Sequence, residues 1–231
     1  MKRSTINSVM RRADEFIRSR GFYLPPFAYW SPEEWRAKGP EAREIVENRL
    51  GWDITDFGKG DFSRFGLFLF TIRNGNPENW KTRQGKLYCE KLLIAEENQV
   101  TPYHYHWTKI EDIINRGGGQ MAIRLYQATP DDRLAGTPVT VSLDGVVRTV
   151  PAGTVLRLSP GESITLPQGM YHSFWAEGGR TLIGEVSGVN DDAADNRFLD
   201  EVGRFPEIEE DEPPLYLLGT DYERYYGKNA R

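Results

Sequence analysis

The sequence predicts an all-β protein built around one antiparallel β-barrel, with an N-terminal helical extension. Between residues 65 and 186, apolar residues come in short runs that alternate with polar residues. Glycine, proline and asparagine separate one run from the next. Short strands with frequent turns between them are typical of an antiparallel sandwich or small barrel. A chain of 231 residues is long enough for one such core with additions at its ends.

We expect a single domain made of three parts. A helical prefix covers residues 1–60, the barrel covers residues 61–190, and an acidic and aromatic C-terminal extension covers residues 191–231. The prefix is expected to cap one end or one face of the barrel. The tyrosines of the extension are expected to pack against the barrel exterior or against a second subunit.

Three helices are expected in the prefix. Apolar residues recur at helical spacing over residues 4–20, and Gly21 suits the end of that helix. The segment Ser31-Pro32-Glu33-Glu34 combines an N-cap, a first-turn proline and two acids, which together predict a helix start. Gly39-Pro40-Glu41 begins a further helix, which is expected to run to about Leu50.

The barrel strands are predicted from the alternation of apolar and polar residues. One pair forms a hairpin, because Asp144-Gly145 suits a type I′ turn. The expected strands cover residues 65–72, 86–94, 120–127, the hairpin 139–150, 155–158, 162–166, 171–176 and 181–186.

Composition excludes several classes of partner. Lysine and arginine number 29 against 34 acids, a net charge of −5, and no basic block is present, which argues against a nucleic acid or an anionic membrane. The single cysteine, Cys89, excludes an internal disulfide and fits a reducing compartment. No apolar run approaches the ~20 residues of a membrane span. We therefore expect a cytoplasmic protein whose substrate is uncharged or held by a metal.

All three histidines of the chain fall into one pattern. In an extended strand His104 and His106 face the same side, so both can bind one ion, and His172 lies in a later strand segment. Glu111 has the wrong parity for a straight strand, so a turn near Trp107 is needed to bring its carboxylate to that ion. Three neutral imidazoles and one carboxylate suit a divalent transition ion with coordination positions left open. The sequence therefore predicts a catalytic metal site.

Two motifs around these histidines resemble those of the cupin family. The stretch His104-x-His106-x4-Glu111-x6-Gly118 resembles the first cupin motif, and Gly161-x5-Pro167-x-Gly169-x2-His172 resembles the second. Ala176 stands where the second motif usually ends in asparagine, which is a turn residue and not a ligand. The resemblance implies a jelly-roll barrel of the cupin type. It does not identify an activity, because one fold supports many.

Further charged residues fall on the strands near this site. Lys109 shares a face with Glu111 if that stretch is extended, which places an ammonium beside the metal; the alternative is an exposed loop lysine. Glu185 lies in an otherwise apolar strand and either reaches the pocket or pairs with a buried base such as Lys91.

Segments that flank the cupin motifs resemble the D-lyxose isomerase family over nearly the whole chain. They are Tyr88-Cys89-x-Lys91, Lys109-x-Glu111, Gly184-Glu185-Val186-Ser187, Asn190-Asp191-Asp192-x-x-Asp195-Asn196-Arg197-Phe198 and Arg204-Phe205-Pro206-Glu207 with the acids that follow. The resemblance implies interconversion of D-lyxose with D-xylulose, and of D-mannose with D-fructose, assisted by Mn²⁺. Since many cupins pair, a homodimer is also expected.

The resemblance also implies roles for individual residues. The reaction is proton transfer through a cis-enediol, which needs a base near two adjacent carbons. We assign the catalytic roles to Lys109 and Glu207, and substrate binding to Lys91, Glu185 and Asp195. Two other functions remain open at this point: a metal-dependent cupin oxygenase, and a sugar-binding cupin without catalysis.

Overall fold

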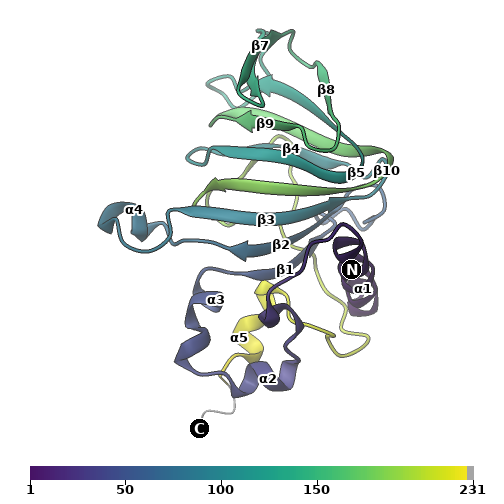
Figure 1. Ribbon diagram of the computed structural model, residues 1–231, viewed down its shortest axis with the longest axis vertical. Coiled ribbons are helices and arrows are strands. Elements are labelled where there is room, and N and C mark those ends of the chain that lie inside the picture. Colours follow the sequence, from purple (N-terminus) through teal and green to yellow (C-terminus); the bar gives the residue numbers. More distant parts are fainter. Residues whose placement is uncertain (228–231) are drawn as a thin grey trace.

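The computed structural model describes residues 1–227, and its eleven strands form one sheet that curls over on itself as a barrel (Figure 1). Every ladder between these strands is antiparallel. The path runs β1-β2-β3-β10-β5-β9-β6-β7, with β4 beside β10, β11 beside β4, and β8 beside β5. The strands are β1 (Gly51–Thr55), β2 (Leu67–Arg73), β3 (Tyr88–Ala95), β4 (Thr101–Tyr105), β5 (Glu111–Gln127), β6 (Val139–Leu143), β7 (Val146–Val150), β8 (Val155–Leu158), β9 (Ser163–Leu166), β10 (Met170–Gly188) and β11 (Arg197–Phe198).

The helices are short apart from the first. They are α1 (Arg3–Ser19), α2 (Pro32–Ala37), α3 (Arg43–Glu47), α4 (Glu78–Thr82) and α5 (Tyr222–Tyr225), with 3₁₀ turns η1 (Pro26–Tyr29), η2 (Pro40–Ala42) and η3 (Gly219–Asp221). Within residues 1–227, none of these helices has the length and apolar character needed to cross a membrane.

Two long strands, β5 and β10, correct the sequence prediction. β5 begins at Glu111 and not at residue 120, and β10 joins the two strands expected at 171–176 and 181–186. Glycines allow this continuity: Gly117 and Gly118 take φ of 128° and 111°, and the register with β10 shifts between Glu177 and Thr181. The glycines of β5 lie opposite the register shift of β10. The two strands therefore bend together at this point, and neither strand ends there.

Replacing Gly118 by alanine is expected to destabilise this bend. A Cβ there would lie 2.1 Å from the carbonyl oxygen of Arg180 in β10, in a backbone conformation that alanine rarely adopts. We expect a loss of about 2 kcal/mol and a Tm lower by roughly 4–8 °C, measured by thermal unfolding. Gly178→Ala is the control, because φ is 71° but a Cβ meets nothing within 4 Å. An equal loss in both variants would contradict the role of the close approach.

The prefix packs on the outer face of β1 to β3. Leu67 and Leu69 point into the barrel core, whereas Phe68 and Phe70 belong to a second cluster with α1, so β2 is apolar on both faces. Buried α1 residues of that cluster are Ile6, Val9, Met10, Ala13 and Ile17. The position of α1 against this side of the sheet is visible in Figure 1.

The helix predictions for the prefix are confirmed with two differences. Ser31 and Glu34 form the full capping box at the start of α2. The helix expected from Gly39 to Leu50 is split into η2 and α3 and ends at Glu47. The prefix also contains a strand, β1, which the prediction missed: Trp52 to Thr55 alternate apolar and polar residues, but the run is too short to give a clear signal.

The C-terminal extension packs against its own chain, as the first of the two alternatives predicted. Tyr216 stacks on Trp52 of β1 with ring centroids 5.7 Å apart, and the Tyr222 hydroxyl donates to the Leu50 carbonyl. The buried Arg3 guanidinium of α1 pairs with Asp221 at 2.9 Å and with Glu210 at 2.7 Å. The last four residues of the predicted extension lie outside the described residues. The type I′ hairpin is also confirmed, with positive φ at Asp144 and Gly145 between β6 and β7.

Candidate metal centre and active site

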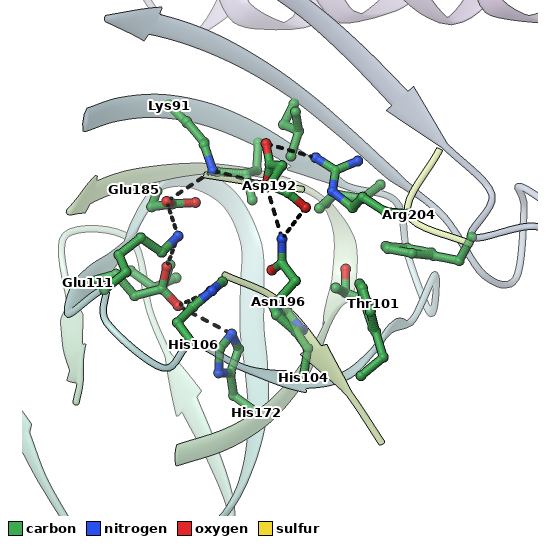
Figure 2. Close-up of a pocket in the computed structure, with 17 residues that line it drawn as sticks. Lys91, Thr101, His104, His106, Glu111, His172, Glu185, Asp192, Asn196 and Arg204 are labelled. Carbon is green, nitrogen blue, oxygen red and sulfur yellow. Dashed lines mark hydrogen bonds and ion pairs between the residues drawn. The ribbon is translucent and has the colours of Figure 1, made fainter. Parts of the chain in front are cut away.

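The structure brings the three histidines together inside the barrel. His104 lies in β4 opposite His172 of β10, and His106 follows directly after β4. One ring nitrogen from each imidazole lies within 4.8 Å of the others. The chain then turns at Trp107 before β5 begins at Glu111, as the parity argument requires. Figure 2 shows the imidazoles of His106 and His172 facing the Glu111 carboxylate, and His104 lies beside His172.

Glu111 completes the cluster. Its Oε1 lies 3.5 Å from His106 Nε2 and 3.3 Å from His172 Nε2. That oxygen is buried and has no hydrogen-bond partner among the described residues. A buried carboxylate oxygen without a donor is costly, so its position beside the imidazoles of His106 and His172 suits a bound cation.

Backbone carbonyls fix the orientation of each imidazole. The Nδ1 atoms of His104, His106 and His172 contact the carbonyl oxygens of Pro102, Asp195 and Met170. Because a carbonyl only accepts, each Nδ1 carries the proton and each Nε2 keeps a free lone pair. Burial and the neighbouring imidazoles lower the pKa of His104 well below its usual range, and burial lowers the pKa of His172 to about 4. The rings of His104 and His172 are therefore neutral, as metal ligation requires.

Asp195 braces the turn between β4 and β5 and does not line the pocket, which corrects its assignment to substrate binding. Its carboxylate accepts from the backbone N–H groups of Trp107, Thr108 and Lys109 and from the Thr108 hydroxyl, at 2.7 to 3.0 Å. Its carbonyl oxygen meets His106. The sequence analysis did not predict this role, because Asp195 and the turn at Trp107 are far apart in the chain.

Lys109 and Glu185 lie side by side in the pocket wall. Lys109 Nζ is 2.7 Å from Glu111 Oε2 and 2.8 Å from Glu185 Oε1, and all three side chains are buried. The alternative of an exposed lysine is therefore wrong. Burial works against the charge of Lys109, but Glu111 and Glu185 outweigh it and raise the lysine pKa. Burial raises the pKa of Glu185, yet the two neighbouring lysines hold it below its usual value. The site thus holds an ammonium next to an ionised carboxylate.

Lys91 reaches the same carboxylate from β3. Its Nζ lies 3.3 Å from Glu185 Oε1, and Glu185 and Lys91 are register partners. Asn190 Oδ1 accepts from both Lys91 and Lys109, at 2.7 and 3.2 Å. The sequence left two alternatives for Glu185, pairing with Lys91 or reaching the pocket. Glu185 does both.

Glu207 does not reach the pocket. Its side chain is exposed, and its backbone carbonyl accepts from the N-terminal amine of Met1 beside α1. The prediction of Glu207 as a catalytic residue was based only on the family resemblance of its motif. The packing of the C-terminal extension on α1 sets its actual position.

The pocket also contains charged and amide side chains that were not predicted as site residues. They are Asp192 and Arg204, on the side away from the histidines, and Asn196, which lies between Asp192 and the histidines (Figure 2). Their signal was present, since all three stand in the flanking motifs that carried the family resemblance. Nothing local showed that the segment after β10 folds back over the barrel mouth.

The empty space in the pocket and at its open mouth together is about 440 Å³. Its apolar lining comes from Phe57, Leu67, Leu69, Leu93, Ile113 and Phe198. An antiparallel barrel with a histidine cluster inside and buried acids and lysines beside it defines a cupin with a site suited to proton transfer on a polar substrate.

Comparisons with known proteins narrow this class. A family model described as D-lyxose isomerase matches residues 1–222. The chain is 49% identical to a D-lyxose/D-mannose isomerase of Serratia proteamaculans, over 97% of this chain and 99% of that protein. It is 46% identical to one of Escherichia coli O157:H7, over 97% and 100%. The chain belongs to the D-lyxose isomerase family and is an aldose–ketose isomerase.

Solved structures agree on the fold. L-ribose isomerase of Acinetobacter sp. DL28 in complex with L-ribose superposes with a TM-score of 0.58 at 16% identity, covering 90% of this chain and 98% of that one. L-ribose isomerase of Cellulomonas parahominis with L-psicose gives 0.55 at 16% identity, covering 87% and 95%. At this identity the likeness supports the cupin barrel alone.

Proposed function

We propose that this chain interconverts D-lyxose with D-xylulose, and D-mannose with D-fructose, with a bound divalent metal. The observation that carries the proposal is the meeting of a histidine cluster and the buried carboxylate Glu185 in one pocket. An aldose–ketose isomerisation needs an electrophile at the oxygens and a base near two adjacent carbons. The names of the two curated relatives support the choice of sugars.

The donor set fits a divalent transition ion. His104, His106 and His172 would offer Nε2 atoms, and Glu111 would offer its unpartnered Oε1. We propose Mn²⁺ as the ion, because mixed imidazole and carboxylate donors with open positions suit it. When bound, the ion supplies a Lewis acid for oxygen atoms of the sugar.

Glu185 is proposed as the proton carrier in place of Glu207. It takes the proton from C2 of the aldose, the electron pair of that bond forms the C1–C2 double bond of an enediolate, and the negatively charged O1 then takes over the proton of the neighbouring C2 hydroxyl. Return of the carried proton to C1, while the C2 oxygen becomes the carbonyl, gives the ketose. Glu185 suits this work because it is an ionised carboxylate that lines the pocket beside the histidine cluster.

Lys109 stabilises negative charge in this scheme. Its ammonium donates to Glu185 and to Asn190 and pairs with Glu111, so it links the proposed metal ligand with the proposed base. Its raised pKa favours a permanent cation over a proton carrier. Lys91 repeats the contact with Glu185 from the other side and holds the carboxylate in place.

The test of the proposed function is a panel of aldoses and ketoses given to the purified protein after chelator treatment, with and without added Mn²⁺. Formation of D-xylulose from D-lyxose that depends on the metal is the expected result. Oxygen consumption with the substrate would support the oxygenase, and sugar binding without turnover would support the non-catalytic cupin.

We also propose that the protein forms a homodimer in the cytoplasm. Trp80, Trp107 and Ile110 are 56%, 49% and 47% exposed and line one surface cavity. Large exposed apolar side chains gathered in one place favour an interface. The free thiol of buried Cys89 supports a reducing compartment.

Trp80→Glu should shift the protein from dimer to monomer in analytical ultracentrifugation, because a charge would have to be buried in the interface. Tyr23→Glu is the control, since Tyr23 is 70% exposed and does not line that cavity. A dimer that survives Trp80→Glu, or a wild-type monomer, contradicts this interface.

A further inference from the structure

A row of alternating charges runs along one wall of the pocket, starting at the histidines. Each neighbour lies within 3.9 Å of the next, and carboxylates alternate with cations. The members, in order from the histidines, are Glu111, Lys109, Glu185, Lys91, Asp192 and Arg204. The first three belong to the chemistry already proposed, whereas the last two lie beyond it (Figure 2).

Arg204 and Asp192 form the far end of the pocket. Arg204 Nη2 lies 3.2 Å from Asp192 Oδ2 and 2.6 Å from Asp53 Oδ2, and the guanidinium stacks on Phe205. Asp192 also lines a second cavity behind the first. Asp192 therefore separates the two cavities, and its ion pair with Arg204 forms the end wall of the pocket.

The end wall contains polar atoms that are available for hydrogen bonds to a ligand. The ion pairs and hydrogen bonds of Arg204 use Nη1 and Nη2, and within residues 1–227 its Nε–H has no hydrogen bond. Asn196 donates through Nδ2 to Asp192, which leaves its Oδ1 as an acceptor. A guanidinium donor beside carboxylate and amide acceptors suits a hydroxyl group, which both donates and accepts.

An open sugar chain has a hydroxyl on nearly every carbon, so it fits a wall of alternating donors and acceptors. Its reacting end belongs at the histidines, so its other end lies toward Arg204. D-lyxose and D-mannose have the same configuration at C2, C3 and C4 and differ by one terminal CH₂OH group. Selection between them therefore has to take place at the end wall.

We propose that Arg204 and Asp192 bind the terminal hydroxyl group of the sugar and thereby set how well hexoses are accepted relative to pentoses. The proposal rests on the proposed isomerase function. It gives the two residues a specificity role and not a part in the proton transfer.

The test compares kcat/KM for D-mannose and 6-deoxy-D-mannose, which form the same pyranose ring and differ only in the terminal hydroxyl. The kcat/KM of the wild-type protein is expected to be about tenfold or more higher for D-mannose. This ratio corresponds to the free energy of one hydrogen bond to a charged group. Arg204→Met should bring that ratio close to one, mainly through a higher KM for D-mannose. A purely structural role for Arg204 would lower both activities equally and leave the ratio unchanged.

Arg180→Met is the matched control. Arg180 also pairs with a carboxylate, Glu96, at 2.7 Å, but it does not line this pocket, so its loss should leave the ratio as in the wild type. If Arg204→Met does not fold, Asp192→Asn keeps the side-chain size and gives the same readout. A wild-type ratio near one, or an unchanged ratio in a folded variant that isomerises D-mannose, overturns the subsite alone. Absence of any aldose turnover by the wild type overturns the proposed function, and the subsite with it.

Discussion

Alanine in place of His106 or His172 is expected to remove both the bound metal and the isomerase activity. Each substitution deletes one of three Nε2 donors that lie within 4.8 Å of one another, and no other histidine exists to replace it. A bound ion contributes several kcal/mol to transition-state stabilisation, so kcat/KM should fall on the order of 10³-fold.

Two measurements check this result together. Metal content after dialysis against Mn²⁺, determined by mass spectrometry, should fall from one ion per chain to well below one. Chelated wild-type protein should regain activity with Mn²⁺, whereas the chelated variants should not. Thermal unfolding serves as the control for folding. One bound metal ion per chain in both alanine variants would contradict the assignment of these histidines as metal ligands.

Glu185→Gln is expected to keep the metal and lose most turnover. The amide preserves the shape of the side chain but cannot accept the substrate proton, and loss of a positioned base costs ~10²–10⁴-fold in rate. The matched control is Glu207→Gln, the same chemical change on an exposed side chain outside the pocket, which should leave kcat unchanged. If Glu207→Gln lost turnover and Glu185→Gln kept it, Glu207 and not Glu185 would be the base.

Heavy water separates proton transfer from its rival, a hydride shift. A proton held by Glu185 can exchange with solvent, so deuterium should appear at C2 of the aldose after partial reaction. A hydride shift transfers the hydrogen directly and leaves C2 without deuterium. Complete absence of deuterium, together with an active Glu185→Gln protein, would remove Glu185 from the mechanism.

Features set by neighbours in the sequence were predicted well. The capping box at Ser31 and the hairpin at Asp144-Gly145 depend on contacts between residues a few positions apart. The placement of His104, His106 and Glu111 was also predictable, because strand parity plus one turn fixes which side chains share a face. His172 was located through its motif and not through periodicity.

Features that depend on long-range packing were not predicted. β5 and β10 run through their glycines because each is supported by the other, which no single segment reveals. Glu185 had two alternatives from the sequence, and only the pairing of β10 with β3 showed that both apply at once.

The sequence by itself determined the cupin barrel, the family and the composition of the histidine cluster, since these follow from residue type at short, fixed spacing. Only the tertiary structure decided how the segment after β10 is used. Asp195 braces the turn at Trp107, and Asp192 and Arg204 close the pocket. Glu207 lies outside, because the ion pair of Arg3 with Asp221 holds the extension against α1. The positions of these side chains depend on partners in distant segments of the chain or on irregular backbone, for which local sequence carries no periodic signal.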